Sequence, residues 1–112
     1  MRGIIALSFL AVASPALAAT YLPTEASKHI GESATIEGLA HVYISKGGTV
    51  FIDLGGYGRE APFSGVIFKD KTSAIANVTS LDGKMVDITG VIKTYRGKPE
   101  IIISEGSQLR AK

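Results

Sequence analysis

The chain has 112 residues, with 12 Lys and Arg against 10 Asp and Glu, and it contains no cysteine. This length accommodates one small domain and excludes multidomain machinery. Without cysteine the domain forms no disulfides, so its stability must come from the apolar core alone. A formal net charge of +2 does not by itself predict a polyanion partner, so the placement of the charges has to decide.

Residues 1–18 have the pattern of a cleavable secretory signal peptide. Arg2 precedes an apolar run at residues 4–12, and residues 16–18 (Ala-Leu-Ala) provide the small side chains that signal peptidase requires. Arg2 is the only charged residue of this stretch, so cleavage would lower the net charge of +2 by one. No later stretch approaches the roughly 20 apolar residues that span a bilayer. We therefore expect a periplasmic or secreted protein, cleaved after Ala18.

The rest of the chain has the composition of a small all-β domain. After an N-terminal extension at residues 19–32, β-branched and aromatic residues alternate with glycine-containing turns through residues 33–109. The predicted strands are residues 35–44, 49–54, 63–68, 85–93 and 99–104.

The connecting segments predict one short helix and several turns. Residues 70–80 predict a helix, since Asp70 and Thr72 can cap its N-terminus. The segment at residues 55–62 is rich in glycine, so we expect a flexible connector without a regular element. Residues 110–112 form a C-terminal tail, and we expect the chain to fray from Gln108 onward.

The order of these elements predicts the fold class. Three strands, a short helix and two further strands occur in the order of the OB-fold, a five-stranded Greek-key barrel. An SH3-like barrel has the same number of strands, but a helix between the third and fourth strands favours the OB-fold. The expected fold is therefore all-β with a minor helical part.

Several segments carry a resemblance to a known family: TVFIDLGG (49–56), PFSGVIF (62–68), LDGK (81–84), VDITG (86–90), YRGKPEI (95–101) and SQL (107–109). Through them, residues 31–109 resemble small bacterial OB-fold proteins and accessory domains named as nucleic-acid binding. Some members are fused to exported nucleases or competence proteins. The resemblance implies the OB-fold, and it implies nucleic-acid binding by analogy at the level of the fold.

OB-folds bind ligands across their second and third strands, between the loop joining strands one and two and the loop joining strands four and five. If Val50, Ile52 and Leu54 face the barrel interior, alternation makes Phe51 and Asp53 face outward. An outward Phe51 can be a platform on which a base or sugar ring stacks. Alternatively, the N-terminal segment or the helix covers it.

Aromatic and basic side chains surround this platform in the expected fold. The predicted ligand-binding residues are Phe51, Tyr43, Lys46, Tyr57, Arg59, Lys93, Tyr95, Arg96 and Lys98. Both loops beside the groove carry positive charge, which suits a phosphate backbone whose bases lie on aromatic rings. Lys and Arg in hairpin turns also serve solubility and the protection of sheet edges.

The sequence predicts no catalytic residue, no metal site and no cofactor. Two histidines without cysteine lack the spacing of a zinc site, and no G-x-S-x-G elbow occurs. The sequence Gly-Tyr-Gly at residues 56–58 lacks the third glycine of a dinucleotide site.

The sequence therefore predicts a non-catalytic, exported OB-fold module that binds single-stranded nucleic acid or another extended anionic polymer. The alternative is an envelope module that binds a peptide, an oligosaccharide or a partner domain in the same groove. An exposed aromatic patch without positive charge around it would favour this alternative.

Overall fold

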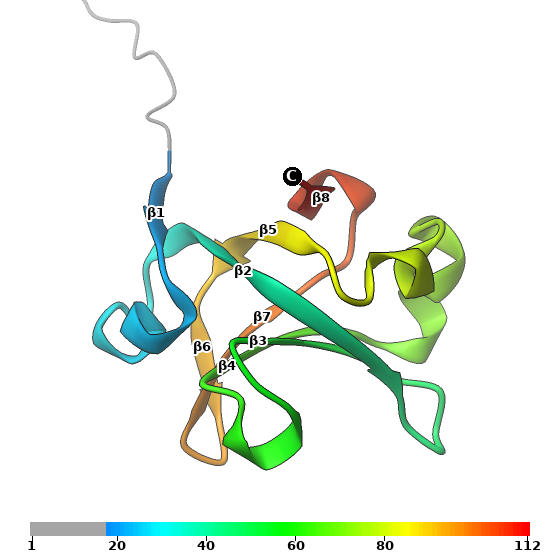
Figure 1. Ribbon diagram of the computed structural model, residues 1–112, viewed down its shortest axis with the longest axis horizontal. Helices are drawn as coiled ribbons and strands as arrows, with labels where there is room; N and C mark the ends of the chain where they lie inside the picture. Colours follow the sequence, from blue (N-terminus) through cyan, green and yellow to red (C-terminus); the bar gives the residue numbers. More distant parts are fainter. Residues whose placement is uncertain (1–17) are drawn as a thin grey trace, which may run out of the picture.

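A computed structural model describes residues 18–112 of the chain (Figure 1). Apart from Ala18, the expected signal peptide lies outside the described residues. Within residues 18–112, no helix combines the length and the apolar character needed to cross a membrane.

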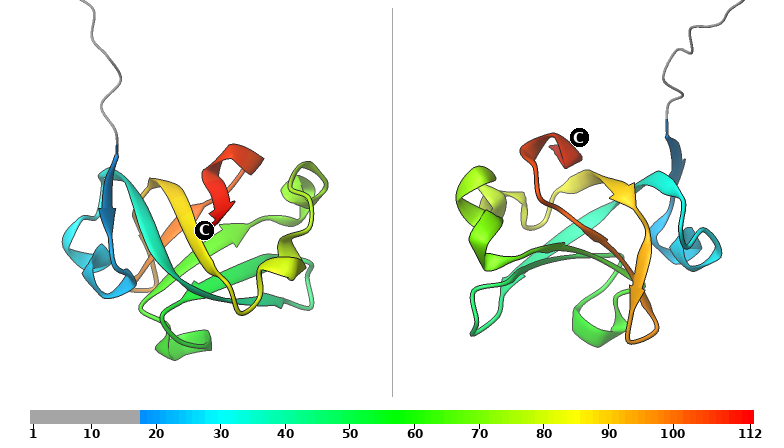
Figure 2. Two further views of the ribbon diagram at one scale, coloured as in Figure 1. Left: turned by 45° about the horizontal axis from the view of Figure 1, so that its top comes forward. Right: turned by 180° about the vertical axis from the view of Figure 1, so that it is seen from behind.

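Strands and short 3₁₀ helices make up the described chain (Figures 1 and 2). The strands are β1 (Ala19–Tyr21), β2 (Ser33–Ile44), β3 (Val50–Leu54), β4 (Phe63–Ile67), β5 (Met85–Val91), β6 (Lys93–Tyr95), β7 (Lys98–Ile102) and β8 (Leu109–Ala111). The 3₁₀ helices are η2 (Pro23–Lys28), η3 (Gly58–Glu60), η4 (Lys69–Ala74), η5 (Val78–Leu81) and η6 (Gly106–Gln108).

The strands form one mixed, 8-stranded sheet in the order β6-β7-β4-β3-β2-β5-β8, with β1 beside β2. β2 pairs antiparallel with both β5 and β3, whereas β4 and β7 are parallel. Only Ile92 separates β5 from β6, and β6 pairs with β7. This stretch therefore links the two sides of the curved sheet.

The expectation of a mostly β fold is confirmed, and the sheet is consistent with an OB-fold. The sheet is larger than the five predicted strands, for two reasons. The fourth predicted strand (residues 85–93) corresponds to β5, and the chain continues past it into a separate strand, β6; the terminal segments add β1 and β8.

The core lies inside the curved sheet and is made of aliphatic side chains with one aromatic ring. Its largest fully buried members are Phe63, Ile36, Ile52, Leu54, Ile67, Ile88, Ile92, Ile101, Ile103 and Val86. On β4, a Cβ added at Gly65 would lie 2.7 Å from Ile88 Cδ1. Glycine at this position therefore lets β4 approach the facing side of the core closely.

The prediction of one helix at residues 70–80 is wrong. This segment forms η4 and η5, and between them Ile75 is extended and Asn77 is in the left-handed conformation with a φ of 58°. A residue in that conformation cannot continue a right-handed helix, so the segment divides into short turns. Ile75 and Val78 are buried and attach it to the core.

Both ends of the described chain are attached to the sheet. At the C-terminus, where fraying was expected, Gln108 Nε2 donates hydrogen bonds to the carbonyl oxygens of Thr89 and Ile102. The next residues form β8 against β5. At the N-terminus β1 runs parallel to β2, and the Tyr21 hydroxyl donates a hydrogen bond to the Glu32 carboxylate.

Candidate functional site

A groove of about 800 Å³ crosses the outer face of β3 between two loops. One loop carries η3, and the other is the β6–β7 hairpin; both project on the same side of the sheet (Figures 1 and 2). The groove is lined by His41, Tyr43, Phe51, Asp53, Gly58, Arg59, Ser64, Tyr95, Arg96, Lys98 and Glu100.

Strand register arranges the outer face into two rows of side chains that cross the strands. The polar row comprises His41, Asp53, Ser64, Glu100 and Lys93, each opposite the next. The apolar row comprises Tyr43, Phe51, Val66 and Ile102, again each opposite the next. Because side chains alternate along a strand, residues two apart place the rows side by side on one face.

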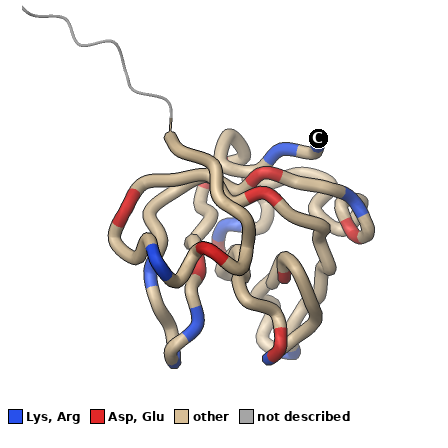
Figure 3. Tube along the Cα trace, turned by 60° about the vertical axis from the view of Figure 1, so that its left-hand side comes forward, with Lys and Arg blue, Asp and Glu red and all other residues tan. Residues whose placement is uncertain are grey.

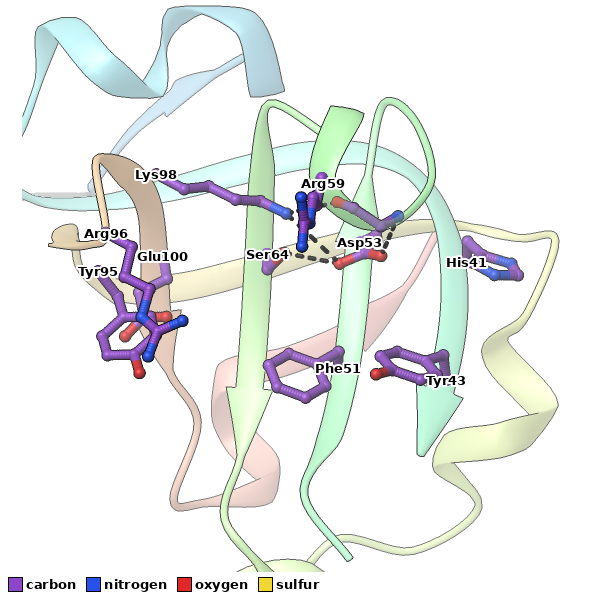
Figure 4. A pocket seen from close by; sticks show the side chains of 11 residues that line it. His41, Tyr43, Phe51, Asp53, Arg59, Ser64, Tyr95, Arg96, Lys98 and Glu100 are labelled. Carbon is purple, nitrogen blue, oxygen red and sulfur yellow. Dashed lines mark hydrogen bonds and ion pairs between the residues drawn. The ribbon is translucent and has the colours of Figure 1, made fainter. Parts of the chain in front are cut away.

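The apolar row begins with a pair of aromatic rings. Phe51 faces away from the core, since its neighbours Val50 and Ile52 are buried. Its ring stacks on that of Tyr43, with 5.4 Å between the centroids and 21° between the planes. Figure 4 shows the two rings side by side on neighbouring strands. Tyr43 is 49% exposed, so its ring is available to a ligand.

Asp53 lies at the centre of the polar row and has a structural role. It is 2% exposed, and its Oδ1 accepts a hydrogen bond of 2.6 Å from the Ser64 hydroxyl. Its Oδ2 accepts one of 2.8 Å from the Gly58 N–H, which fixes the loop that carries η3. Lys98 Nζ lies 3.9 Å from Asp53 Oδ1 and donates to the Gly58 carbonyl oxygen. The buried carboxylate thus has both hydrogen bonds and a counter-charge, as burial of a charge requires.

These contacts correct the expectation that residues 55–62 are a flexible connector without a regular element. The segment contains η3, and Asp53 and Lys98 both bind its first residue, Gly58. Sequence reasoning missed this because the anchoring lysine lies 40 residues further along the chain.

The opposite wall is the turn of the β6–β7 hairpin. Arg96 and Gly97 both have positive φ angles, of 53° and 80°, the pattern of a two-residue hairpin turn of type I′. The Arg96 guanidinium lies over the Tyr95 ring, 5.2 Å from its centroid. This turn presents an aromatic ring and a cation to the groove together (Figure 4).

Glu100 completes this end of the groove. Burial raises the pKa of its carboxyl, while the nearby charges of Lys93 and Lys98 act in the opposite direction. Its carboxylate forms no hydrogen bond or ion pair with another side chain of residues 18–112. The two carboxylate oxygens of Glu100 can therefore accept hydrogen bonds from a ligand in the groove.

The charges of the groove are mixed. Lys98 is paired with Asp53, whereas neither Arg59 nor Arg96 has an acidic partner among the described residues. Over the whole fold, acidic and basic positions are interspersed along the trace (Figure 3). Unpaired positive charge in the groove therefore comes from the two flanking loops, through Arg59 and Arg96.

The structure brings most of the sequence-predicted site residues together. Those that line the groove are Tyr43, Phe51, Arg59, Tyr95, Arg96 and Lys98. Those that do not are Lys46, Tyr57 and Lys93. Tyr57 contacts the edge of the His41 ring at 4.3 Å between centroids, just beyond the groove. Lys93 lies opposite Glu100, and Lys46 is exposed in the β2–β3 turn.

The groove also contains residues that the predicted site omitted. Alternation along the strands placed His41 and Asp53 on the outer face, but it gave no sign that Asp53 is buried there. Ser64 and Glu100 enter through the pairing of β4 with β3 and with β7. The parallel β4–β7 pair joins segments distant in sequence, so no local pattern reveals it.

Residues 18–112 contain no group of three or more His, Cys, Asp or Glu side chains placed to hold a metal ion. The histidines make local contacts instead. His29 Nδ1 lies 2.8 Å from Glu32 Oε2, and this hydrogen bond holds the pKa of Glu32 below its usual value. His41 Nδ1 lies 3.3 Å from Asp82 Oδ1 at the rim of the groove.

The sequence matches no family model and no curated protein. The structure is similar to part of a protein from Leishmania major Friedlin whose name describes an aspartyl-tRNA synthetase, with a TM-score of 0.54 and 10% identity. This match covers 95% of the present chain, which spans only 23% of that protein. A chain of the S. pombe Stn1–Ten1 complex matches with a TM-score of 0.48 and 15% identity, over 88% of this chain and 79% of that chain. The synthetase likeness, at such low identity, is one of fold.

Proposed function

We propose that this protein is a non-catalytic module that binds single-stranded nucleic acid in the groove across β3. The observation that carries the proposal is the stacked pair of Tyr43 and Phe51, which lines the same groove as Arg59 and Arg96 from the two flanking loops. Stacking on aromatic rings stabilises a bound base by about 1 to 3 kcal/mol whatever its identity. The two arginines can contact the phosphates of the same strand.

A single strand suits this groove better than a duplex. In a duplex the base faces are stacked on their neighbours and cannot lie on Tyr43 or Phe51. A single strand exposes them, and a rim of cations then holds its backbone. The mixed charge of the groove indicates contact with a few phosphates rather than wrapping of a long polyanion.

The alternative of a peptide or oligosaccharide ligand predicts an aromatic patch without positive charge around it. Here Arg59 and Arg96 line the same groove as the aromatic pair, and neither has an acidic partner in the described chain. The arrangement therefore favours an anionic ligand. The name of the structural neighbour with a TM-score of 0.54 refers to tRNA, which is the same class of ligand.

The proposal includes the architecture and the location of the module. We propose that the sheet closes as a five-stranded Greek-key barrel, because β5 pairs with β2 while β6, one residue later, pairs with β7. We also propose that the protein acts in the periplasm or outside the cell, on the strength of the sequence pattern at residues 1–18.

A titration of the protein with a fluorescently labelled oligo(dT) at two salt concentrations tests the function. We expect binding that weakens as salt rises, because phosphate contacts release counterions. Arg59→Gln should weaken binding and reduce its salt dependence, whereas Lys71→Gln on exposed η4 should change neither. No binding at low salt, or binding that is indifferent to salt, would contradict the proposal.

A further inference from the structure

Most polar groups of the groove floor are already occupied. The Asp53 carboxylate accepts from Gly58 and Ser64, and Lys98 donates to the Gly58 carbonyl oxygen. Glu100 is different, because its carboxylate lines the groove without a hydrogen-bond partner among residues 18–112. A ligand in this groove therefore finds an acceptor pair at Glu100.

The position of Glu100 relative to Phe51 is set by strand register. Phe51 on β3 lies opposite Val66 on β4, and Glu100 on β7 lies opposite Ser64, two residues before Val66. Ser64 lines the groove between Asp53 and Glu100, so the groove continues across β4 from Phe51 toward Glu100. Figure 4 shows Phe51 and Glu100 on the same face of the sheet, with β4 between them. A base that stacks on Phe51 and extends across β4 would bring its edge toward Glu100.

The hydrogen-bonding capacity of the Glu100 carboxylate decides which base edge it can recognise. An ionised carboxylate only accepts hydrogen bonds, and its two oxygens suit two adjacent donors. On its Watson–Crick edge, guanine presents N1–H and N2–H side by side. Cytosine and adenine each present one amino group next to an acceptor nitrogen, and thymine presents one N–H between two carbonyl oxygens. Guanine alone offers the matching pair of donors.

We propose that Glu100 makes this groove prefer guanine, through two hydrogen bonds from the base edge to its carboxylate. The inference rests on the proposed function, that is, on single-stranded nucleic acid binding in the groove. Lys93 and Lys98 flank Glu100, and their charges favour its ionised form against the effect of burial. The same lysines offset the repulsion between this carboxylate and the phosphates of the ligand.

The test compares short oligo(dT) strands that carry one central dG, dI, dA or dC with the all-thymine strand. We expect the dG strand to bind at least about 5-fold more tightly, the lower end of what a bidentate contact discriminates. The dI strand, which lacks the 2-amino group, should lose most of this advantage. A single guanine per strand prevents assembly of guanines into higher-order structures.

Variants separate base recognition from general electrostatics. Glu100→Leu should remove the preference for dG, because leucine accepts no hydrogen bond. It should also strengthen the binding of the all-thymine strand, because a negative charge leaves the groove. Glu60→Gln removes the same charge from exposed η3, outside the groove lining. We expect Glu60→Gln to keep the dG preference of the unmodified protein.

The possible outcomes are distinct. If all strands bind with equal affinity, the guanine preference is wrong while the proposed function stands. A preference that survives in Glu100→Leu would also overturn the role of Glu100. If no strand binds at low salt, the proposed function fails and this inference fails with it.

Discussion

The rings of Tyr43 and Phe51 lie 5.4 Å apart on neighbouring strands and face away from the core. Aromatic rings usually contribute to stability by being buried, and here half of the Tyr43 side chain is left in contact with solvent. Arg59 and Arg96, one from each flanking loop, line the same groove. The arrangement suits a ligand that has flat rings and an anionic backbone.

Phe51→Leu should weaken oligo(dT) binding by about 5- to 150-fold, the loss of about 1 to 3 kcal/mol of stacking. Leucine keeps an apolar side chain opposite Val66, so the free energy of unfolding should change by only about 1 kcal/mol or less. Fluorescence anisotropy and urea denaturation measure the two effects. Tyr57→Leu is the matched control, because Tyr57 is exposed outside the groove lining. Equal losses in both variants would contradict the assignment.

Arg96→Asn should separate binding from folding. Asparagine tolerates the left-handed conformation of this position, and Asn-Gly is a favoured type I′ turn, so the hairpin should keep its stability. The loss of the guanidinium should weaken oligo(dT) binding and lower the slope of log affinity against log salt by about one phosphate contact. A variant that folds normally and binds with an unchanged salt slope would show that Arg96 contacts no phosphate.

Asp53→Ala should destabilise the protein by about 2 to 4 kcal/mol, because the Gly58 N–H and the Ser64 hydroxyl lose their acceptor and Lys98 loses its counter-charge. The loop that carries η3 should become mobile, since it loses the hydrogen bond to Gly58. Urea denaturation measures the first effect, and amide hydrogen exchange at Gly58 measures the second. Unchanged protection of that amide would contradict the anchoring role of Asp53.

Glu100→Gln should raise the free energy of unfolding at neutral pH. Burial raises the pKa of Glu100, so the folded state holds this proton more tightly than the unfolded chain does. The resulting stabilisation is complete below the ordinary glutamate pKa of about 4.3 and is lost as the pH rises through the higher pKa of the folded state. The gain from Gln should therefore disappear in acid. Denaturation of both proteins across this range measures it, and a variant less stable than the unmodified protein at pH 7 would contradict it.

The β character of the fold could be predicted from local patterns, because alternation in β3 and the turns at glycine are short-range signals. The two short turns at residues 70–80 could not be distinguished from a helix, because the extended Ile75 and the left-handed Asn77 that divide the segment leave no local sequence signal. The attachment of β1 and β8 also escaped prediction. Both are short strands stabilised by pairing with a longer neighbour, β2 or β5, rather than by their own sequence pattern.

The candidate site was predictable where it depends on alternation along single strands. Phe51, Tyr43 and the hairpin residues follow from that rule and from the turn at residues 95–98. Asp53 was expected on the outer face, but its burial depends on Lys98 and Gly58, which only tertiary structure brings to it. Glu100 faces the groove because β7 pairs with β4, a contact between distant segments.

Chemical-shift mapping by NMR with unlabelled oligo(dT) tests the central claim most directly. The account predicts that the largest changes occur at the ring protons of Tyr43 and Phe51, shifted upfield by stacked bases, and at Arg59 and Arg96. The outer face of β5 should be unaffected. Changes confined to that face, or none at saturating oligonucleotide, would contradict the account.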